Sequence, residues 1–333
     1  MPATLRGSAL VVRDELAGVG LELPALVASS GRAAAHATLE FFAARLSNPH
    51  TRRAYLAALH RFGHWCDRRG LALDGLTPTR VAAYVADLES QLSLASLKLH
   101  AAALRHWLDY LTERGILGAN PARSVRTPRL VVREGKTPVL ERDEARRIFA
   151  ELDRAARGPR PLLALRDRAL LGVMLFGFVR VGAALRMRVR DFEGEGASAS
   201  LVLHEKGGKE RRIPCHHQAR TYLREYIAAA GLEPCSGVPL FQSAPHRRNA
   251  LSGRVLDPSA AWSMVKRRCR QAKLPGHLTN HSFRATGLTL HQENGGRLED
   301  AQALAGHADA RTTRLYIRQR RELAQREVER VQI

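Results

Sequence analysis

The sequence is short of acidic residues and cysteines, and it has no long apolar run. Its 32 Asp and Glu residues are outnumbered by 53 Lys and Arg residues, so the formal net charge is +21. No apolar stretch reaches the roughly 18 residues of a membrane-spanning helix, and the first residues lack the charged-then-apolar pattern of a signal peptide. We therefore expect a soluble intracellular protein with no membrane partner.

The four cysteines are too far apart to suggest a metal knuckle or a disulfide framework. None forms a C-x-x-C pair, and a chain of 333 residues can bury a core without covalent staples. Cys215, His216 and His217 are adjacent, but no second ligand pair follows at zinc-finger spacing. A phosphate-cradling glycine loop is also missing, since the glycines of 194–196 lack the strand and helix that would flank one. We expect free thiols, no metal and no cofactor.

The excess of basic charge is the strongest signal in the composition. Such an excess repels itself unless it is spread out or neutralised by a polyanion, and nucleic acid is the commonest polyanion. A basic protein from an arginine-rich proteome would show the same balance without binding nucleic acid. Charge alone favours a nucleic-acid partner over that alternative.

The length allows two domains, and the first shows clear helical periodicity. Residues 1–35 have weak periodicity, so we expect a loosely ordered arm with at most one short helix. Residues 36–122 repeat apolar residues at helical spacing in four segments, and Asn48, Thr77 and Ser93 are good capping residues at the starts of three of them. We predict a compact four-helix domain whose outer faces carry Arg52, Arg53, Arg61, Arg68, Lys98, His100 and Arg105.

The rest of the chain predicts a linker and a second, mixed domain. Residues 123–138 are basic and rich in proline, which indicates an extended linker that either lies along phosphates or is merely solvated. Residues 201–214 alternate across Gly207-Gly208 and predict a hairpin. Residues 139–319 thus form a mainly helical domain with a small antiparallel sheet, and 320–333 form a charged C-terminal helix. The other predicted helices are 141–155, 163–177, 217–230, 258–272, 282–293 and 297–305.

Several polar residues of the second domain are candidates for chemistry. His281 and Arg284 are three residues apart and share a helix face. Gly306 can end a helix and leave His307 in the following turn, 23 residues after Arg284. Tyr316 follows His307 by nine residues on an amphipathic segment.

Two further candidates lie upstream of these. Arg180 follows a buried apolar run, so we expect its guanidinium to emerge at the edge of the core, and Lys206 stands at the tip of the predicted hairpin. Each candidate also has an ordinary explanation when it is taken alone. A tyrosine at helical spacing is usually a core residue, and a lysine in a turn is usually a solvated charge.

The order of the whole set resembles that of the tyrosine recombinases of the phage integrase and Xer type. Their pattern of Arg, hairpin Lys, H-x-x-R, G-H and Tyr is matched by "FVR", "EKGGKERRIP", "HSFR", "AGH" and "TTRLYI". "RDRALLGVMLFGFVRVGAALRMRVRDF" and "LSLASLKLHAAALRHWLDYLTERGILGANPA" are also similar to family segments. The resemblance spans roughly residues 36–320. It implies a mainly α fold with a small antiparallel β-sheet, divided into a four-helix core-binding (SAM-like) domain and a catalytic domain.

The resemblance also implies a role for each matching residue. Tyr316 is the nucleophile that forms a 3′-phosphotyrosyl link to DNA, and Lys206 is the general acid for the departing 5′-hydroxyl. His281 takes a proton. His307 hydrogen-bonds the phosphate, and Arg180 and Arg284 clamp its oxygens. A covalent link conserves the bond energy, so we expect strand exchange without ATP or metal.

Two positions depart from the family pattern. Members usually carry an acidic residue three positions after the first arginine, where this chain has Ala183. The residue after the second arginine is often histidine, and here it is Ala285. Neither position belongs to the catalytic set. We expect weaker support for Arg180 and Arg284, with activity reduced but not lost.

The resemblance implies a site-specific DNA recombinase, and it also suggests partners. We expect double-stranded DNA, a homotetramer or a heterotetramer with a related recombinase on paired sites, accessory DNA-bending proteins, and a C-terminal helix exchanged between subunits. The location would be cytoplasmic and nucleoid-associated. The alternatives are a type IB topoisomerase-like enzyme that relaxes DNA as a monomer, and an inactive DNA-binding relative.

Overall fold

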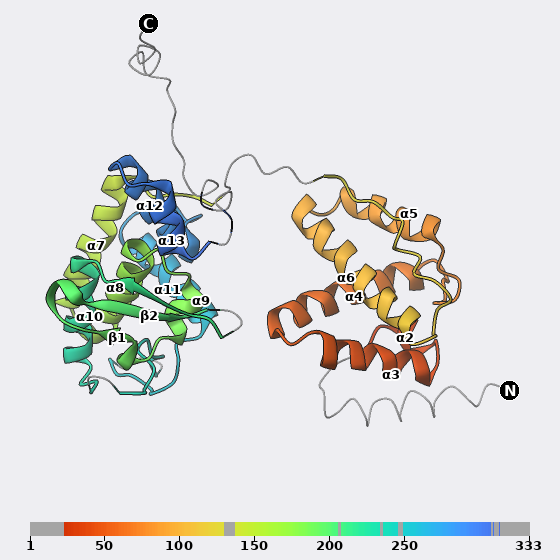
Figure 1. The fold of residues 1–333 in the computed structure, drawn as a ribbon, viewed down its shortest axis with the longest axis horizontal. Helices are drawn as coiled ribbons and strands as arrows, with labels where there is room; N and C mark the ends of the chain where they lie inside the picture. Colours follow the sequence, from red (N-terminus) through yellow and green to blue (C-terminus); the bar gives the residue numbers. More distant parts are fainter. Residues whose placement is uncertain are drawn as a thin grey trace, which may run out of the picture. The chain divides into compact units, whose positions relative to one another are not determined.

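The computed structural model describes residues 23–129, 137–205, 208–233, 236–245, 249–307, 309 and 313. The chain splits into two compact units, Met1–Val131 and Val132–Ile333, called the first and second units below (Figure 1). The fold is mainly helical with one small antiparallel sheet, as the sequence predicts. No helix within these described residues is long and apolar enough to cross a membrane.

The first unit is built from helices whose starts the sequence encodes locally. The side chains of Asn48, Thr77 and Ser93 each accept a backbone N–H two or three residues ahead, which satisfies an orphan donor of the first turn. These caps confirm the predicted starts. The described helices are α2 (Ala25–Ala28), α3 (Arg32–Glu40), the π-helix η1 (Phe41–Arg45), α4 (Pro49–Asp67), α5 (Pro78–Glu89) and α6 (Leu94–Glu113).

The prediction of a loosely ordered arm is wrong for residues 23–35. This stretch forms α2 and the start of α3, and Leu26, Val27 and Ala34 are buried in the core of the first unit. Pro24 lies so close to α4 that a Cβ at Gly63 would come within 2.6 Å of the Pro24 Cβ. The burial relies on alanines and a tight backbone approach, which leave a weak hydrophobic stripe in the sequence. Residues 1–22 of the predicted arm lie outside the described residues.

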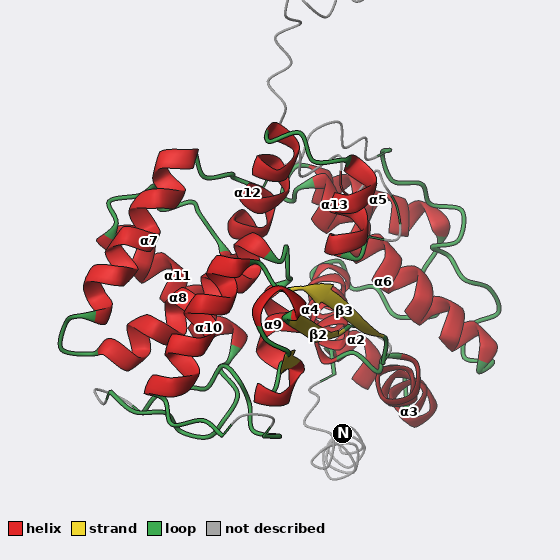
Figure 2. Ribbon diagram, turned by 60° about the vertical axis from the view of Figure 1, so that its left-hand side comes forward, coloured by secondary structure: helices red, strands yellow, loops and turns green. Residues whose placement is uncertain are grey.

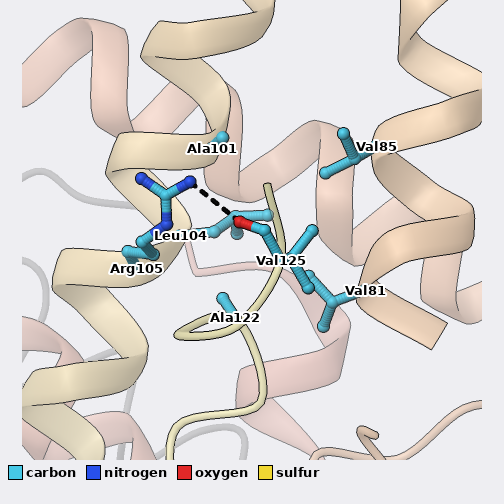
Figure 3. A pocket seen from close by; sticks show the side chains of 7 residues that line it. All are labelled: Val81, Val85, Ala101, Leu104, Arg105, Ala122 and Val125. Atoms are coloured by element: carbon cyan, nitrogen blue, oxygen red, sulfur yellow. Dashed lines mark hydrogen bonds between the residues drawn. The ribbon is translucent and has the colours of Figure 1, made fainter. Parts of the chain in front are cut away.

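The predicted linker begins on the surface of the first unit. Ala122 is buried, and Val125 lines a cavity of about 10 Å³, roughly the space of one water, between α5 and α6 (Figure 3). An Arg105 guanidinium N–H donates to the Val125 carbonyl over 3.0 Å, and the backbone N–H of Ala122 donates to the side chain of Asn120. Residues 123–125 are therefore anchored. Residues 130–136 of the predicted linker lie outside the described residues.

The second unit is arranged around α8 (Pro161–Phe176), which packs against α7, α10 and α12 (Figure 1). Strands β1, β2 and β3 follow one another in an antiparallel sheet beside α9, with His204 opposite Glu210 (Figure 2). The predicted hairpin is confirmed, whereas α9 and β1 were not predicted. The described elements are α7 (Arg142–Ala156), α9 (Val181–Arg186), η2 (Val189–Asp191), β1 (Phe192–Glu193), η3 (Gly196–Ser198), β2 (Ser200–His204), β3 (Glu210–Pro214), α10 (His217–Ala229), α11 (Pro258–Gln271), α12 (Asn280–Glu293) and α13 (Leu298–Ala305).

Candidate active site

A tight turn after α8 places Arg180. Helix α8 ends at Phe176, and Phe178 adopts a left-handed conformation with φ 51°, which is costly for a bulky residue, at about 1–3 kcal/mol. Arg180 then becomes the N-cap of α9, with 41% of its side chain exposed. The expectation that Arg180 emerges at the edge of the core is met, but it begins a short helix of its own instead of extending the buried one.

The same turn holds Arg284, which lies on α12. Helix α12 starts at Asn280, with Thr279 and Ser282 forming a reciprocal cap, and it packs so closely on α8 that Gly287 has no room for a Cβ beside the Leu175 carbonyl. The Arg284 side chain is 1% exposed, and its Nη1 donates to the carbonyl of Phe178. Thus a single turn presents Arg180 and fixes Arg284.

His307 follows α13, in the position the sequence predicts. Gly306 ends the helix with φ 62°, a left-handed conformation that favours glycine. The Nη2 of Arg284 donates to the Ala305 carbonyl (2.8 Å) and lies 2.6 Å from the Nε2 of His307. A guanidinium can only donate, so Nε2 accepts and the proton sits on Nδ1, which donates to the Thr313 hydroxyl 2.9 Å away.

Both histidines of the site are held neutral. Burial, followed by the charges of Arg284, Arg180 and Arg211, lowers the pKa of His307 to about 3. Desolvation of its ring and then the same two charges, Arg284 and Arg180, lower the pKa of His281, although the residue as a whole is exposed. Neutral imidazoles can accept a proton or a hydrogen bond, which is what a base needs.

The β2–β3 hairpin reaches the same place. Glu205 directly follows β2, and its Oε1 lies 3.8 Å from the Nη1 of Arg180 and 3.0 Å from the Nη2 of Arg211. Nη1 of Arg211 donates to the Leu304 carbonyl at the end of α13 over 2.6 Å. The base of the hairpin is thereby joined to the turn that carries His307.

The structure brings together four of the six predicted residues: Arg180, His281, Arg284 and His307. The other two, Lys206 and Tyr316, lie outside the described residues. Thr313, which is buried and bonded to His307, precedes Tyr316 by three positions. Ala183 and Ala285, where the family pattern has other residues, are both buried.

The sequence reasoning missed Glu205, Arg211 and Thr313. Glu205 and Arg211 were detectable in principle, because Arg211 pairs with Leu203 across the hairpin and Glu205 is its diagonal neighbour on the same face. Thr313 carried no signal beyond its closeness to Tyr316. Among the described residues, no cluster of His, Cys, Asp and Glu could hold a metal. His216 instead caps α10, where its ring accepts the backbone N–H of Gln218.

Comparison with known proteins places this site in a family. The model described as "Phage integrase family" matches residues 138–322, and "Phage integrase, N-terminal SAM-like domain" matches residues 40–115. The first of these covers more than half of the chain. The chain belongs to the phage integrase family. Its core-binding and catalytic domains correspond to the first and second units.

Similar proteins support this assignment. Tyrosine recombinase XerC of Serratia marcescens is 32% identical over 68% of this chain and 69% of its own length. Tyrosine recombinase XerC of Myxococcus xanthus is 30% identical over 84% of this chain and 91% of its own length. The chain is a tyrosine-type site-specific DNA recombinase, and the alternatives of a topoisomerase and an inactive relative are not favoured.

Solved structures share the fold. XerH site-specific recombinase bound to difH substrate superposes with a TM-score of 0.65 at 21% identity, covering 89% of this chain and 83% of that one. A lambda integrase dimer bound to a COC′ core site superposes with a TM-score of 0.62 at 21% identity, covering 86% of this chain and 96% of that one.

Proposed function

We propose that Arg180, Lys206, His281, Arg284, His307 and Tyr316 form one active site, which cuts and rejoins DNA strands through a 3′-phosphotyrosyl intermediate. The observation that carries the proposal is the gathering of the first arginine and the H-x-x-R pair around His307, by contacts spanning more than a hundred residues, such as the one between Arg284 and Phe178. Residues so distant in sequence converge here on a place rich in positive charge.

The two arginines suit the charge that develops during phosphoryl transfer. Arg284 donates to two backbone carbonyls and lies against one imidazole, and these contacts hold its guanidinium in a fixed orientation. Arg180 is partly exposed, so its guanidinium can be approached from solvent. A pair of rigid forks can bind the non-bridging oxygens and stabilise the extra charge of the transition state.

The remaining roles divide between proton transfer and attack. Tyr316 attacks phosphorus, and the positive site favours its phenoxide, whose unperturbed pKa is about 10. His281, neutral and exposed, accepts the phenolic proton, and Lys206 protonates the departing 5′-oxygen. Because the phosphotyrosyl bond conserves the energy of the cut bond, the reaction proceeds without ATP or metal.

We propose a positioning role for His307 besides the expected hydrogen bond to the phosphate. Its Nε2 accepts from Arg284 and its Nδ1 donates to Thr313, so both ring nitrogens are engaged within the protein. We assign it to holding Arg284 in place. A direct hydrogen bond to the phosphate would require one ring nitrogen to exchange its partner.

Double-stranded DNA is the substrate in this proposal. Arg53 and Arg61 on α4, and Arg68 at its C-terminal end, are exposed and can contact phosphates, which makes the affinity sensitive to salt. Two of the predicted surface cations serve the protein itself, because Arg52 donates to the Leu46 carbonyl and Arg105 to that of Val125.

The active assembly is proposed to be a tetramer on paired sites. The structural relatives include a lambda integrase dimer on a core site and a lambda integrase tetramer on a Holliday junction. The tetramer would hold four copies of this chain or include a related recombinase, with residues 320–333 exchanged between subunits. Accessory DNA-bending proteins and a cytoplasmic, nucleoid-associated location complete the proposal.

The test begins with a Tyr316→Phe variant, which removes the nucleophile and leaves the binding surfaces intact. DNA fragments retained by this variant define the site. The substrate is then a duplex of that site with a nick close to the cleavage position. Cleavage releases the short fragment that carries the 5′-hydroxyl, so religation is prevented and the covalent intermediate accumulates. We expect a protein–DNA adduct from the wild type and none from Tyr316→Phe.

A matched control removes another tyrosine hydroxyl from the second unit. Tyr222 lies on α10, and its ring packs against the guanidinium of Arg168. It is not one of the proposed catalytic residues, so the Tyr222→Phe variant should form the adduct as the wild type does. If the wild type gives no adduct on the selected DNA, or if Tyr316→Phe gives the same adduct, the proposed mechanism is wrong.

A further inference from the structure

The active site contains a carboxylate to which no catalytic role has been given. Among the described residues, Glu205 is the one that forms an ion pair with Arg180, at 3.8 Å between Oε1 and Nη1. Ala183, one turn along α9 from Arg180, is buried and uncharged. The countercharge of Arg180 therefore comes from the hairpin.

Arg211 extends this contact to a third element. Its Nε and Nη2 both approach the Oε1 of Glu205, at 3.3 and 3.0 Å, while its Nη1 donates to the Leu304 carbonyl. One guanidinium thus connects the end of β2 with the last turn of α13. Both side chains are only about one fifth exposed, so water screens the pair less than it would on an open surface.

The backbone at Gly306 is fitted to the pair. A Cβ at this position would lie 2.7 Å from the Oε1 of Glu205 and 2.8 Å from the Nε of Arg211, so a larger residue would displace the pair. The pair therefore lies directly against the residue that precedes His307. Glycine is favoured here by its left-handed φ of 62°, and its missing side chain leaves room for this close approach.

We infer that Glu205 and Arg211 form a positioning pair that orients Arg180 and ties the hairpin carrying Lys206 to the turn carrying His307. The inference rests on the proposed function, because it assumes that Arg180 acts on the phosphate. Glu205 limits the directions that the half-exposed Arg180 samples. Arg211 cancels the carboxylate charge, so the pair orients Arg180 without reducing the net positive charge of the site.

The test uses Glu205→Gln, which keeps the size of the side chain and removes its charge. With the nicked substrate, we expect the single-turnover cleavage rate to fall about 10- to 100-fold, as misplacement of a catalytic group does, while affinity for the site stays within about twofold. A purely structural defect would instead weaken binding and lower the melting temperature.

The matched control is Glu210→Gln, the same substitution on the other strand of the hairpin. Glu210 pairs with His204 and is largely exposed, so its loss should leave the cleavage rate unchanged. Glu205→Asp keeps the charge on a shorter stem and should restore most of the rate. This second variant also decides the matter if Glu205→Gln fails to fold.

A substrate with a neutral methylphosphonate at the cleaved position gives an independent readout. Its phosphate lacks the charge that an oriented Arg180 would stabilise, so the defect of Glu205→Gln should shrink to a few-fold on this substrate. A defect that is equally large on both substrates would overturn the inference.

The outcomes separate the two proposals. If the wild type forms no Tyr316-dependent adduct, the proposed function fails. If the wild type forms the adduct and Glu205→Gln forms it at the same rate, the proposed function stands and the positioning pair is refuted.

Discussion

The two units bury different kinds of side chain. Among the described residues of the first unit, Thr38 is the buried polar residue, and the remaining core is apolar or aromatic. The second unit buries charged groups in its interior. These polar and charged residues are Arg166, Asp167, Arg168, Asp191, Ser200, Gln242, Arg268, Asn280, Ser282, Arg284, Thr286, Thr289, His307 and Thr313.

The apolar core of the first unit suits a scaffold that presents a surface. Phe62, Trp65 and Tyr84 form a cluster with ring centroids 4.9–6.3 Å apart, a packing that stabilises helices without placing any charge. In the proposed function, binding to phosphates depends on exposed arginines such as Arg53. Buried charge would cost stability here and would contribute nothing to binding.

The second unit must hold cations at fixed positions inside a core. Asp167, which is fully buried, bonds to Arg166 (2.7 Å), Arg268 (2.8 Å) and Arg267 (3.1 Å) and so ties α8 to α11. Helix α8 also supports α12, which carries Arg284. Among the described residues, buried charged side chains thus occur in the unit that carries the candidate active site, and the core of the first unit contains none.

The largest effect is expected from Asp167→Ala. The change leaves two buried guanidinium groups without their countercharge, which should cost the second unit about 3–5 kcal/mol of unfolding free energy. Hydrogen exchange should show faster exchange in α8 and α11 and unchanged exchange in α4 and α6. Asp143→Ala removes an exposed pair with Arg146 and should cost below about 1 kcal/mol.

If Asp167→Ala increased hydrogen exchange equally in both units, or in neither, the buried ions would not be a source of stability specific to the second unit. A loss confined to the second unit would instead show that its buried ions act as one network within that unit.

A second effect is a dependence of stability on pH that His307 confers on the second unit. The pKa of His307 is about 3 in the folded chain, against about 6.5 for an ordinary histidine, so the unfolded chain binds the proton first as the pH falls. Stability is therefore retained above about pH 6.5 and is lost progressively towards pH 3, with about 2 kcal/mol lost between pH 7 and 5.

The measurement is denaturant unfolding at pH 7 and pH 5 for the wild type and for His307→Gln. Other titrating groups contribute to both proteins, so the difference between their pH slopes isolates the histidine. If the unfolding free energies of the wild type and of His307→Gln depended on pH equally, His307 would not be a buried neutral imidazole. The difference between the cores of the two units would then be smaller than the structure indicates.

The smallest effect is expected at a buried hydrogen bond between two side chains of the first unit. The indole N–H of Trp107 donates to the Thr38 hydroxyl over 3.0 Å. Thr38→Val keeps the shape and leaves this donor unpaired, at a cost of about 1–2 kcal/mol, whereas Thr38→Ser keeps the acceptor and should cost less. Thermal unfolding of the first unit compares the two variants, and equal losses would show that methyl packing matters more than the hydrogen bond.

Much of the fold was predictable because its signals are local. Asn48, Thr77 and Ser93 cap helices within three residues, and Gly207-Gly208 marks the hairpin. The helices of 23–35 were missed because α2 is only four residues long and the start of α3 buries alanines, which give a weak hydrophobic pattern. Helix α9 was missed because the left-handed turn before it is made by a phenylalanine, Phe178, and by no glycine.

The site was predictable as a set of residues but not as a set of contacts. The order of the arginines and histidines identified Arg180, His281, Arg284 and His307, which the structure gathers. The pairing of Glu205 with Arg180, and of Arg211 with a carbonyl 93 residues away, depends on tertiary packing that no local pattern records. The roles of the six residues remain predictions.

The way Arg284 is held has a consequence for how such a chain can diverge. Two of its acceptors are main-chain carbonyls, at Phe178 and Ala305, and every amino acid supplies a carbonyl. No point mutation at those two positions deletes the acceptor itself. The hydrogen bonds that hold Arg284 are therefore preserved as long as the course of the backbone is preserved. The side chains at these two positions can change during evolution while the guanidinium stays in place.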